Sequence, residues 1–356
     1  MHSADPSARG RAARSNRPGR FEQFDRDTVD DGWDMKDEQS TIRTEVSIER
    51  PRKIITRNTS PDIPFDRSIN PYRGCEHGCV YCFARPTHAY LGMSPGLDFE
   101  TRLIARPDAP NLLARELSAK SYQPNVIAIG TNTDPYQPIE KKHRIMRRCL
   151  EVLRDFNHPV AIVTKGTLIE RDLDILGEMG RQGLVRVGIS VTTLDPKTSR
   201  AMEPRVPHPA RRLQTVRRLS DAGCPVRIMC SPVVPGLTDH ELEAILEAGA
   251  EAGAISANWI MLRLPREVAP LFKEWLEAEF PTRAAKVMAR VREVHGGQEY
   301  DAEWGKRMTG EGTYAQLISH RFALQSKRLG LKAQLPPLRC DLFRPPARSG
   351  DQLSLF

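Results

Sequence analysis

Short runs of β-branched and other apolar residues alternate with helically spaced apolar residues through the middle of this 356-residue chain. Strands are predicted at residues 126–129, 160–163, 184–191, 226–230 and 259–262, with another just before Cys75. Successive strands begin roughly 25 to 40 residues apart, a spacing that fits βα units with parallel strands. The pattern therefore predicts an α/β fold of six such units. It leaves open whether they form an open doubly wound sheet or a partial barrel.

The regions outside this alternation differ from it in composition. Residues 1–43 carry Arg9, Arg11, Arg14, Arg17 and Arg20 among small residues, followed by an acidic stretch. Such a segment cannot bury enough apolar surface to offset its ordering entropy, so we expect a disordered basic tail. A lead-in segment at 44–65 precedes the core at 66–266. A helical extension is expected at 267–335, with helices at 267–295 and about 314–329, and a proline-rich flexible tail at 336–356.

Charge and hydropathy limit the possible partners. The formal net charge is +8, which favours a polyanionic partner such as DNA, although a solvated basic surface explains it equally well. No run of 18 or more apolar residues occurs, so we expect no membrane-spanning helix. The first residues lack the apolar core of a secretory signal. We therefore expect a cytoplasmic protein whose seven Cys remain reduced.

Three of those cysteines, Cys75, Cys79 and Cys82, fall within eight residues. Thiolates separated by three and two residues can each bind one corner of a four-iron, four-sulfur cluster, and Gly74 and Gly78 permit the tight loop. The next Cys is far along the chain, so the fourth iron is left open to another ligand. The alternative is a structural zinc site completed by His77 or His88, but such sites usually show paired C-x2-C knuckles.

The C-x3-C-x2-C spacing, with the aromatic Tyr81 before the last Cys, resembles the radical S-adenosylmethionine (radical SAM) superfamily. The resemblance implies a partial (β/α)6 TIM-type barrel over residues 66–266. It implies that the open iron binds the amino and carboxylate groups of S-adenosylmethionine. It further implies reductive cleavage to a 5′-deoxyadenosyl radical, with an electron donor such as flavodoxin or ferredoxin. Tyr81 is then a cofactor-binding candidate.

Barrel enzymes place their active sites at the carboxyl ends of the strands, which selects further candidates. After the second predicted strand, the resemblance places an ammonium-binding segment at four polar residues: Thr131, Asn132, Thr133 and Asp134. The alternative is a turn in which Asp134 caps the next helix.

Later strand ends add four weaker candidates. Lys165 can pair with the methionine carboxylate, and Ser190 and Thr192 can bond the ribose hydroxyls. A solvated lysine and hydroxyls bonded to local backbone are the alternatives. Cys230, at the end of the fifth strand, is a weak catalytic candidate if it faces the cavity, although a lone Cys there is more often buried.

The longer strings NPYRGCEHGCVYCFARPTH and TDPYQPIE resemble the spore photoproduct lyase-like branch of that superfamily. The activity characterised there reverses a thymine dimer in DNA, using a hydrogen-donating Cys in the loop after strand two. Residues 131–140 contain no Cys, so this chain departs from the pattern, with Cys230 or Cys340 as possible substitutes. We predict a radical SAM enzyme of unknown substrate, for which a nucleic acid, in DNA repair or modification, is the leading candidate. The alternatives are a nucleic-acid-binding protein with a structural zinc site and an interaction protein with a vestigial barrel.

The last five residues, from Gln352 to Phe356, read QLSLF and follow a stretch rich in Pro and Gly. An apolar peptide on a mobile tether has nothing local to pack against and can anchor in a pocket of another protein. The string resembles the peptide with which bacterial polymerases and repair enzymes bind the DNA polymerase sliding clamp. We therefore predict clamp binding; the alternative is that these residues fold back on the barrel.

Overall fold

The computed structural model describes residues 10–22 and 42–347 of the chain. Its main sheet has six parallel strands, with an antiparallel strand, β2 (Ile55–Arg57), at one edge. The parallel strands are β3 (Arg67–Ile69), β6 (Ile127–Ile129), β7 (Val160–Thr164), β8 (Val185–Ser190), β9 (Val226–Val233) and β10 (Ser256–Met261). All six predicted strand positions are confirmed.

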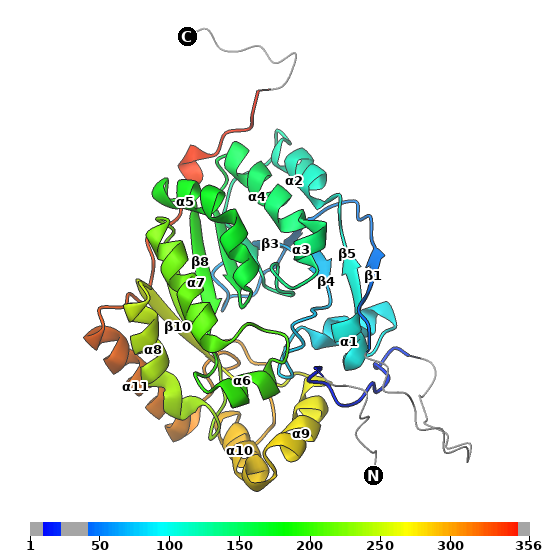
Figure 1. The fold of residues 1–356 in the computed structure, drawn as a ribbon, viewed down its shortest axis with the longest axis vertical. Coiled ribbons are helices and arrows are strands. Elements are labelled where there is room, and N and C mark those ends of the chain that lie inside the picture. The colour runs from blue at the N-terminus through cyan, green and yellow to red at the C-terminus, as the bar shows by residue number, and fades with distance from the viewer. Residues whose placement is uncertain (1–9, 23–41, 348–356) are drawn as a thin grey trace.

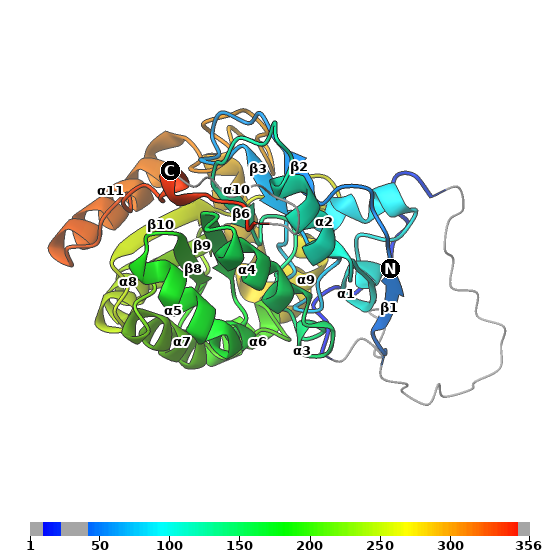
Figure 2. The same cartoon turned by 90° about the horizontal axis from the view of Figure 1, so that it is seen from above.

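The winding of the sheet separates the two folds that the sequence left open. The strands lie in the order β2-β3-β6-β7-β8-β9-β10, so each new parallel strand is added on the same side. A doubly wound sheet would reverse direction at a switch point. The order therefore confirms the predicted partial barrel, whose curved sheet is enclosed by helices in Figures 1 and 2.

Helices between consecutive strands form the outer layer. They are α2 (Ala109–Leu117), α3 (Glu140–His143), α4 (Ile145–Asp155), α5 (Leu173–Arg181), α6 (Pro196–Met202), α7 (Pro209–Asp221) and α8 (Leu242–Glu251). Short 3-10 turns, η4 (Thr167–Asp172) and η5 (Asp239–Glu241), precede α5 and α8. Helix α4 illustrates the packing, because Ile145, Met146, Cys149, Leu150 and Leu153 are all fully buried. This apolar stripe was predicted from its helical spacing.

A small second sheet positions the cysteine segment. It joins β1 (Glu45–Ile48), β5 (Arg102–Ala105) and β4 (Tyr72–Arg73), and β4 leads directly into Cys75. Two 3-10 turns, η2 (Arg85–Thr87) and η3 (Ala89–Leu91), and helix α1 (Leu97–Thr101) complete the return to β5. The cysteine loop is thus held between two sheets.

The C-terminal extension is helical as predicted, with different boundaries. It contains α9 (Val268–Glu279), α10 (Pro281–Val294) and α11 (Gly312–Arg328), followed by the turn η6 (Cys340–Leu342). Residues 267–295, expected to be helical throughout, are split because Pro281 lacks the N–H needed to continue α9 and instead begins α10. Among the described residues, no helix is long and apolar enough to cross a membrane.

Two predictions about the ends need correction. Residues 10–22 are not a free tail, because Ala12 and Ala13 are buried against the core. Phe343, in the predicted flexible tail, packs against Tyr122 and His158, with ring centroids 5.5 and 5.4 Å apart. Long-range partners supply the burial that local composition does not reveal. Residues 1–9, 23–41 and 348–356, including the QLSLF peptide, lie outside the described residues.

Candidate active site

A cavity opens at the carboxyl ends of the parallel strands, where the sequence predicted the site. The cysteine loop forms one wall, and the ends of β6, β7, β8, β9 and β10 supply the others. The polar and sulfur-bearing lining residues include Cys75, His77, Cys79, Tyr81, Cys82, Thr131, Asn132, Thr133, Asp134, Thr164, Lys165, Ser190, Met229, Ser231, Met261 and Arg263.

The three cysteines of the loop all line this cavity and none forms a disulfide. Gly74 and Gly78 have φ values of +73° and +66°, and a Cβ on Gly78 would lie 2.6 Å from Glu100 Oε2. These glycines therefore serve the tight backbone that the sequence suggested. Burial raises the pKa of each thiol, and for Cys75 and Cys79 neighbouring acidic groups raise the pKa further. Bound iron would supply the positive charge that such thiolates need.

The donor set fits an iron–sulfur cluster better than zinc. Within the described residues, no three His, Cys, Asp or Glu side chains are arranged to hold one metal ion. A cluster binds each thiolate at a different iron, so its ligands need not converge on one point. The two histidines proposed for zinc have other contacts: His77 Nδ1 lies 3.3 Å from Asp134 Oδ2, and His88 Nε2 lies 2.9 Å from the carbonyl oxygen of Arg102.

The loop after β6 passes very close to the neighbouring strand. Gly130 has φ +89°, and a Cβ there would lie 1.9 Å from the carbonyl oxygen of Val163. Thr131 and Asn132 line the cavity, and their side chains have no hydrogen-bond partner in the described part of the chain. Thr133 Oγ1 donates to the carbonyl oxygen of Tyr72 at 3.1 Å. Thr131 and Asn132 are therefore the free polar groups of this loop.

Asp134 has a structural role that the sequence did not reveal, because its carboxylate has several partners within the protein. It accepts hydrogen bonds from Thr164 Oγ1 at 2.6 Å, from the Lys165 backbone N–H at 2.8 Å and from the Tyr136 N–H at 2.9 Å. Burial raises the pKa of Asp134, but His77 and these hydrogen bonds outweigh it, and the pKa is lowered. Asp134 thus fixes the loop to β7 and faces the cysteine loop, and the contact of its carboxylate with a ligand ammonium stays a prediction.

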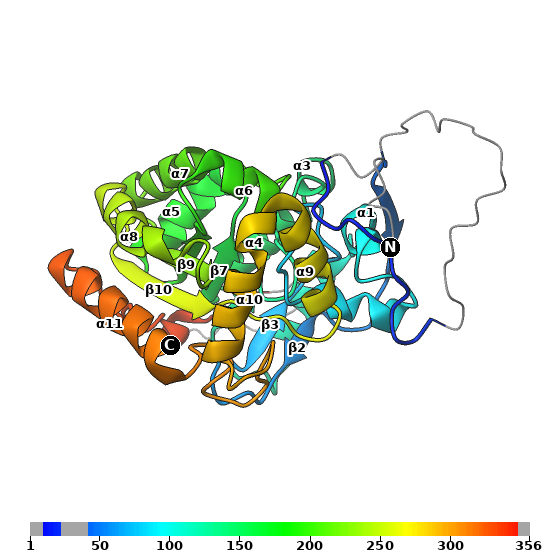
Figure 3. The ribbon, with the colours of Figure 1, turned by 90° about the horizontal axis from the view of Figure 1, so that it is seen from below.

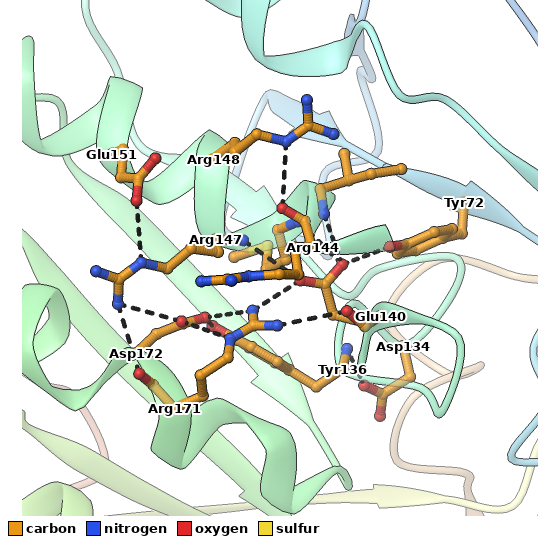
Figure 4. Close-up of polar contacts among 12 residues, drawn as sticks. Tyr72, Asp134, Tyr136, Glu140, Arg144, Arg147, Arg148, Glu151, Arg171 and Asp172 are labelled. Carbon is orange, nitrogen blue, oxygen red and sulfur yellow. Dashed lines mark hydrogen bonds and ion pairs between the residues drawn. The ribbon is translucent and has the colours of Figure 1, made fainter. Parts of the chain in front are cut away.

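The rest of this motif is also structural, as Figure 4 shows. Tyr136 donates its hydroxyl to Asp172 Oδ2 at 3.1 Å. Glu140, whose side chain is fully buried, accepts from the N–H of Ile145 at 2.9 Å, from Arg171 at 2.7 Å and from the Tyr72 hydroxyl. These bonds tie the loop to the start of α4, the turn η4 and β4.

Lys165 lies at the centre of the cavity wall. Its Nζ donates to the carbonyl oxygen of Ser231 at 3.2 Å and lies 3.5 Å from Glu203 Oε1. The same atom sits 5.7 Å from the centroid of the Tyr81 ring. The contact of Lys165 with a ligand carboxylate stays a prediction.

Glu203, which the sequence analysis missed, organises the opposite side of the cysteine loop. Its fully buried carboxylate lies 2.9 Å from Arg212 and accepts hydrogen bonds from Thr192 at 3.0 Å and from the Tyr81 hydroxyl. Burial raises the pKa of Glu203, but Arg212 and Lys165 outweigh it and lower the pKa to about 2. Glu203 follows α6, well away from any predicted strand end, so no local signal marked it.

The remaining predicted residues differ in whether they reach the cavity. Ser190 lines the cavity, whereas Thr192 does not and donates to Glu203 instead. On β9 the side chains alternate, so Met229 and Ser231 face the cavity and Cys230 faces the helical layer. Cys230 is 1% exposed and belongs to the apolar core, as do Cys149 and Cys224. Cys230 therefore follows the buried alternative and does not line this cavity.

A second cation, Arg263, follows β10 and was also missed. Its guanidinium carbon lies 5.0 Å from the centroid of Phe83 and 5.9 Å from that of Tyr300, and it donates to the Tyr300 hydroxyl at 3.3 Å. No carboxylate of the described residues forms an ion pair with it. An arginine without an ion-pair partner among the described residues thus borders the cavity, beside the exposed ring of Phe83.

Comparison with known proteins gives consistent results. The model of the radical SAM superfamily matches residues 69–249. An uncharacterized protein of Mycobacterium tuberculosis is 34% identical over 285 residues, which cover 79% of this chain and 83% of that protein. An uncharacterized protein of Methanocaldococcus jannaschii is 26% identical over 214 residues, covering 60% of this chain and 76% of that one.

Solved structures agree at the level of the fold. Spore photoproduct lyase complexed with dinucleoside spore photoproduct aligns with a TM-score of 0.55 at 15% identity, covering 80% of both chains. A mutant of that enzyme with bound AdoMet and the same dinucleoside has a TM-score of 0.53 at 14% identity, again covering 80% of each chain. At these identities the likeness shows a shared fold.

Proposed function

The chain belongs to the radical SAM superfamily, and from this premise we propose that it is a radical enzyme acting on a nucleic acid. Membership implies a four-iron, four-sulfur cluster and S-adenosylmethionine as cofactors. When both are bound and the cluster is reduced, they supply a 5′-deoxyadenosyl radical that abstracts hydrogen from the substrate. The single observation that carries the proposal is the convergence of Cys75, Cys79 and Cys82 on one cavity at the strand ends.

The lining residues take distinct positions around the cofactors. We assign cluster ligation to the three cysteines, and binding of the methionine ammonium to Thr131 and Asn132, whose polar atoms are free. Lys165 faces the methionine carboxylate, and Ser190 the ribose. Glu203 acts indirectly by holding Tyr81, Thr192 and Lys165 in place. The chain thus orients the cofactor and excludes water, while the cofactors supply the chemistry.

The substrate side supports a nucleic acid. Arg263 offers a cation that no carboxylate in the described part of the chain pairs with, and Phe83, which is 47% exposed, offers a ring on which a base can stack. The net charge of +8 and the dinucleoside bound by the structural neighbours point the same way. Apart from the three cluster cysteines, the sulfur-bearing residues lining the cavity are Met229 and Met261. We therefore propose DNA repair or modification without a thiol hydrogen donor from this part of the chain.

The proposal is tested by replacing one cluster ligand. Anaerobically purified protein should contain iron and sulfide and should form 5′-deoxyadenosine when given reductant and S-adenosylmethionine. Cys79→Ala should lose most iron and all 5′-deoxyadenosine, because two thiolates cannot retain the cluster. Cys149→Ala is the matched control, since Cys149 lies in the core and should leave both unchanged. A Cys79→Ala protein that still forms 5′-deoxyadenosine, or a wild type holding zinc, contradicts the proposal.

The substrate is tested separately by product analysis with damaged or modified DNA and RNA. Arg263→Gln should raise KM for an active nucleic acid while uncoupled formation of 5′-deoxyadenosine is retained, because Arg263 is placed on the substrate and not on the cofactors. An unchanged KM would remove Arg263 from the substrate site.

We propose two protein partners and a location on narrower grounds. A reductant such as flavodoxin or ferredoxin must reduce the cluster. We propose a cytoplasmic location, because all seven cysteines are free, which suits the reducing cytoplasm.

The QLSLF sequence supports binding to the DNA polymerase sliding clamp. Titration of purified clamp should show binding by the full chain and none by a chain ending at Gly350; equal binding by both contradicts it.

A further inference from the structure

The back of the cysteine loop rests on a buried ion pair. Arg85 and Glu100 both have fully buried side chains, and Arg85 Nη2 lies 2.5 Å from Glu100 Oε1. The same guanidinium donates to the carbonyl oxygens of Cys79 at 3.0 Å and Gly78 at 3.1 Å. The backbone that carries Cys79 is therefore fixed by Arg85, and Arg85 is compensated by Glu100.

The N-terminal arm, defined as residues 10–22, completes this arrangement. The N–H groups of Ala12 and Ala13 donate to the Glu100 carboxylate at 3.3 and 3.0 Å. Arg11 donates to the Glu100 backbone carbonyl at 2.8 Å and to Thr44 Oγ1 at 2.9 Å. Without the arm, Glu100 would lose three of these hydrogen bonds and would face water.

The arginines of the arm are used to hold it in place. Arg14, Arg17 and Arg20 pair with Glu279, Glu274 and Glu267, respectively, so the arm runs antiparallel to α9. Ser15 adds a hydrogen bond of 2.7 Å to Glu274. Figure 3 shows the arm between α9 and α1.

The surface beneath the arm is shaped to receive it. Gly96 lies so close that a Cβ there would be 2.2 Å from the carbonyl oxygen of Ser15. Asn16 and Asp98 exchange hydrogen bonds, with Asn16 Nδ2 donating to Asp98 Oδ1 at 3.0 Å and the Asp98 N–H donating to Asn16 Oδ1 at 3.1 Å. The contact is therefore specific and does not depend on charge alone.

We propose that the N-terminal arm is a positioning element of the cluster site. It acts through Glu100 and Arg85 on the backbone at Gly78 and Cys79, and it shields that side of the loop from water and oxygen. The inference rests on the proposed function, since it assumes that Cys75, Cys79 and Cys82 hold the cluster. Four arginines of the predicted basic tail, Arg11, Arg14, Arg17 and Arg20, are thereby engaged within the protein.

The test compares the full chain with a variant lacking residues 1–22, both reconstituted anaerobically. The deletion should bleach severalfold faster in air and should shift the reduction potential of the cluster. A lower iron content without a shift in potential or bleaching rate would indicate a general loss of stability and overturn the positioning role. If the wild-type protein binds no cluster, the proposed function is wrong. If both proteins bind the cluster and have the same bleaching rate and reduction potential, only the positioning role of the arm is wrong.

A charge exchange separates docking of the arm from folding. Glu274→Arg should repel Arg17 and accelerate bleaching, and adding Arg17→Glu should restore the wild-type rate. Arg290→Gln, which breaks an exposed ion pair with Glu293 on α10, is the matched control and should change nothing. Failure of the double variant to recover contradicts docking of the arm on α9.

Discussion

Two buried carboxylates, Asp134 and Glu203, flank the cysteine loop, and their buried charges are stabilised by different kinds of partner. Asp134 is held by neutral donors from its own loop and from the end of β7, together with His77 of the cysteine loop. Glu203 lies between two cations, Arg212 and Lys165, which come from different βα units. The first carboxylate shapes one loop, whereas the second balances charges that would otherwise be buried alone. Losing Glu203 should therefore do more damage than losing Asp134.

The largest effect is expected for Glu203→Gln. The variant keeps the shape but leaves the fully buried Arg212 without its counter-ion, which typically costs about 3–5 kcal/mol. Denaturant unfolding of the cofactor-free protein measures this loss. Glu178→Gln, an exposed carboxylate on α5, should be neutral. A loss below that of Asp134→Asn would reverse the comparison.

Acid should lower the free energy of unfolding of the wild-type protein, because Glu203 becomes protonated. The folded pKa of Glu203 is about 2, below its ordinary value of 4.5, so its stabilisation is present above pH 4.5 and lost as pH falls toward 2. The shift corresponds to about 3 kcal/mol. The difference in stability between wild type and Glu203→Gln should therefore shrink across this window. Parallel stability curves would show that Glu203 does not titrate as proposed.

Asp134→Asn should have a smaller effect. An amide replaces one acceptor oxygen with a donor, so at least one of the hydrogen bonds from Thr164, Lys165 and Tyr136 is lost, at roughly 1–3 kcal/mol. Thermal unfolding measures the change. Thr164→Val, which removes only the hydroxyl that donates to Asp134, should account for part of it. A neutral Asp134→Asn would mean that the carboxylate is not needed to fix the loop.

The smallest effect is expected for Cys230→Ala. Its side chain faces the helical layer, so the variant should lose only about 1 kcal/mol of packing and keep 5′-deoxyadenosine formation. Loss of activity at full cofactor loading would return Cys230 to the cavity and contradict the strand parity.

Periodicity and local motifs predicted the structural features that are determined by residues close together in the sequence. The strands, the buried stripe of α4 and the cysteine loop all carry such signals. Asp134 was found as a candidate, but its structural role was not, because its partners His77 and Thr164 come from other segments of the chain. Glu203, Arg263 and the docking of Arg14 on Glu279 depend on residues far apart in the chain, which no local pattern encodes.

The pairing of the arm with α9 also orders events during synthesis. Arg20 and Glu267 are 247 residues apart, and Arg14 and Glu279 are 265 apart. At about 5–20 residues per second, the arm leaves the ribosome roughly 10 to 50 s before its helix exists. The cysteine loop and Glu100 are complete early in that interval, but the ion pairs that hold the arm on α9 can form only at the end. We therefore expect a period in which assembly factors can reach the loop from behind, and it ends when α9 has been made.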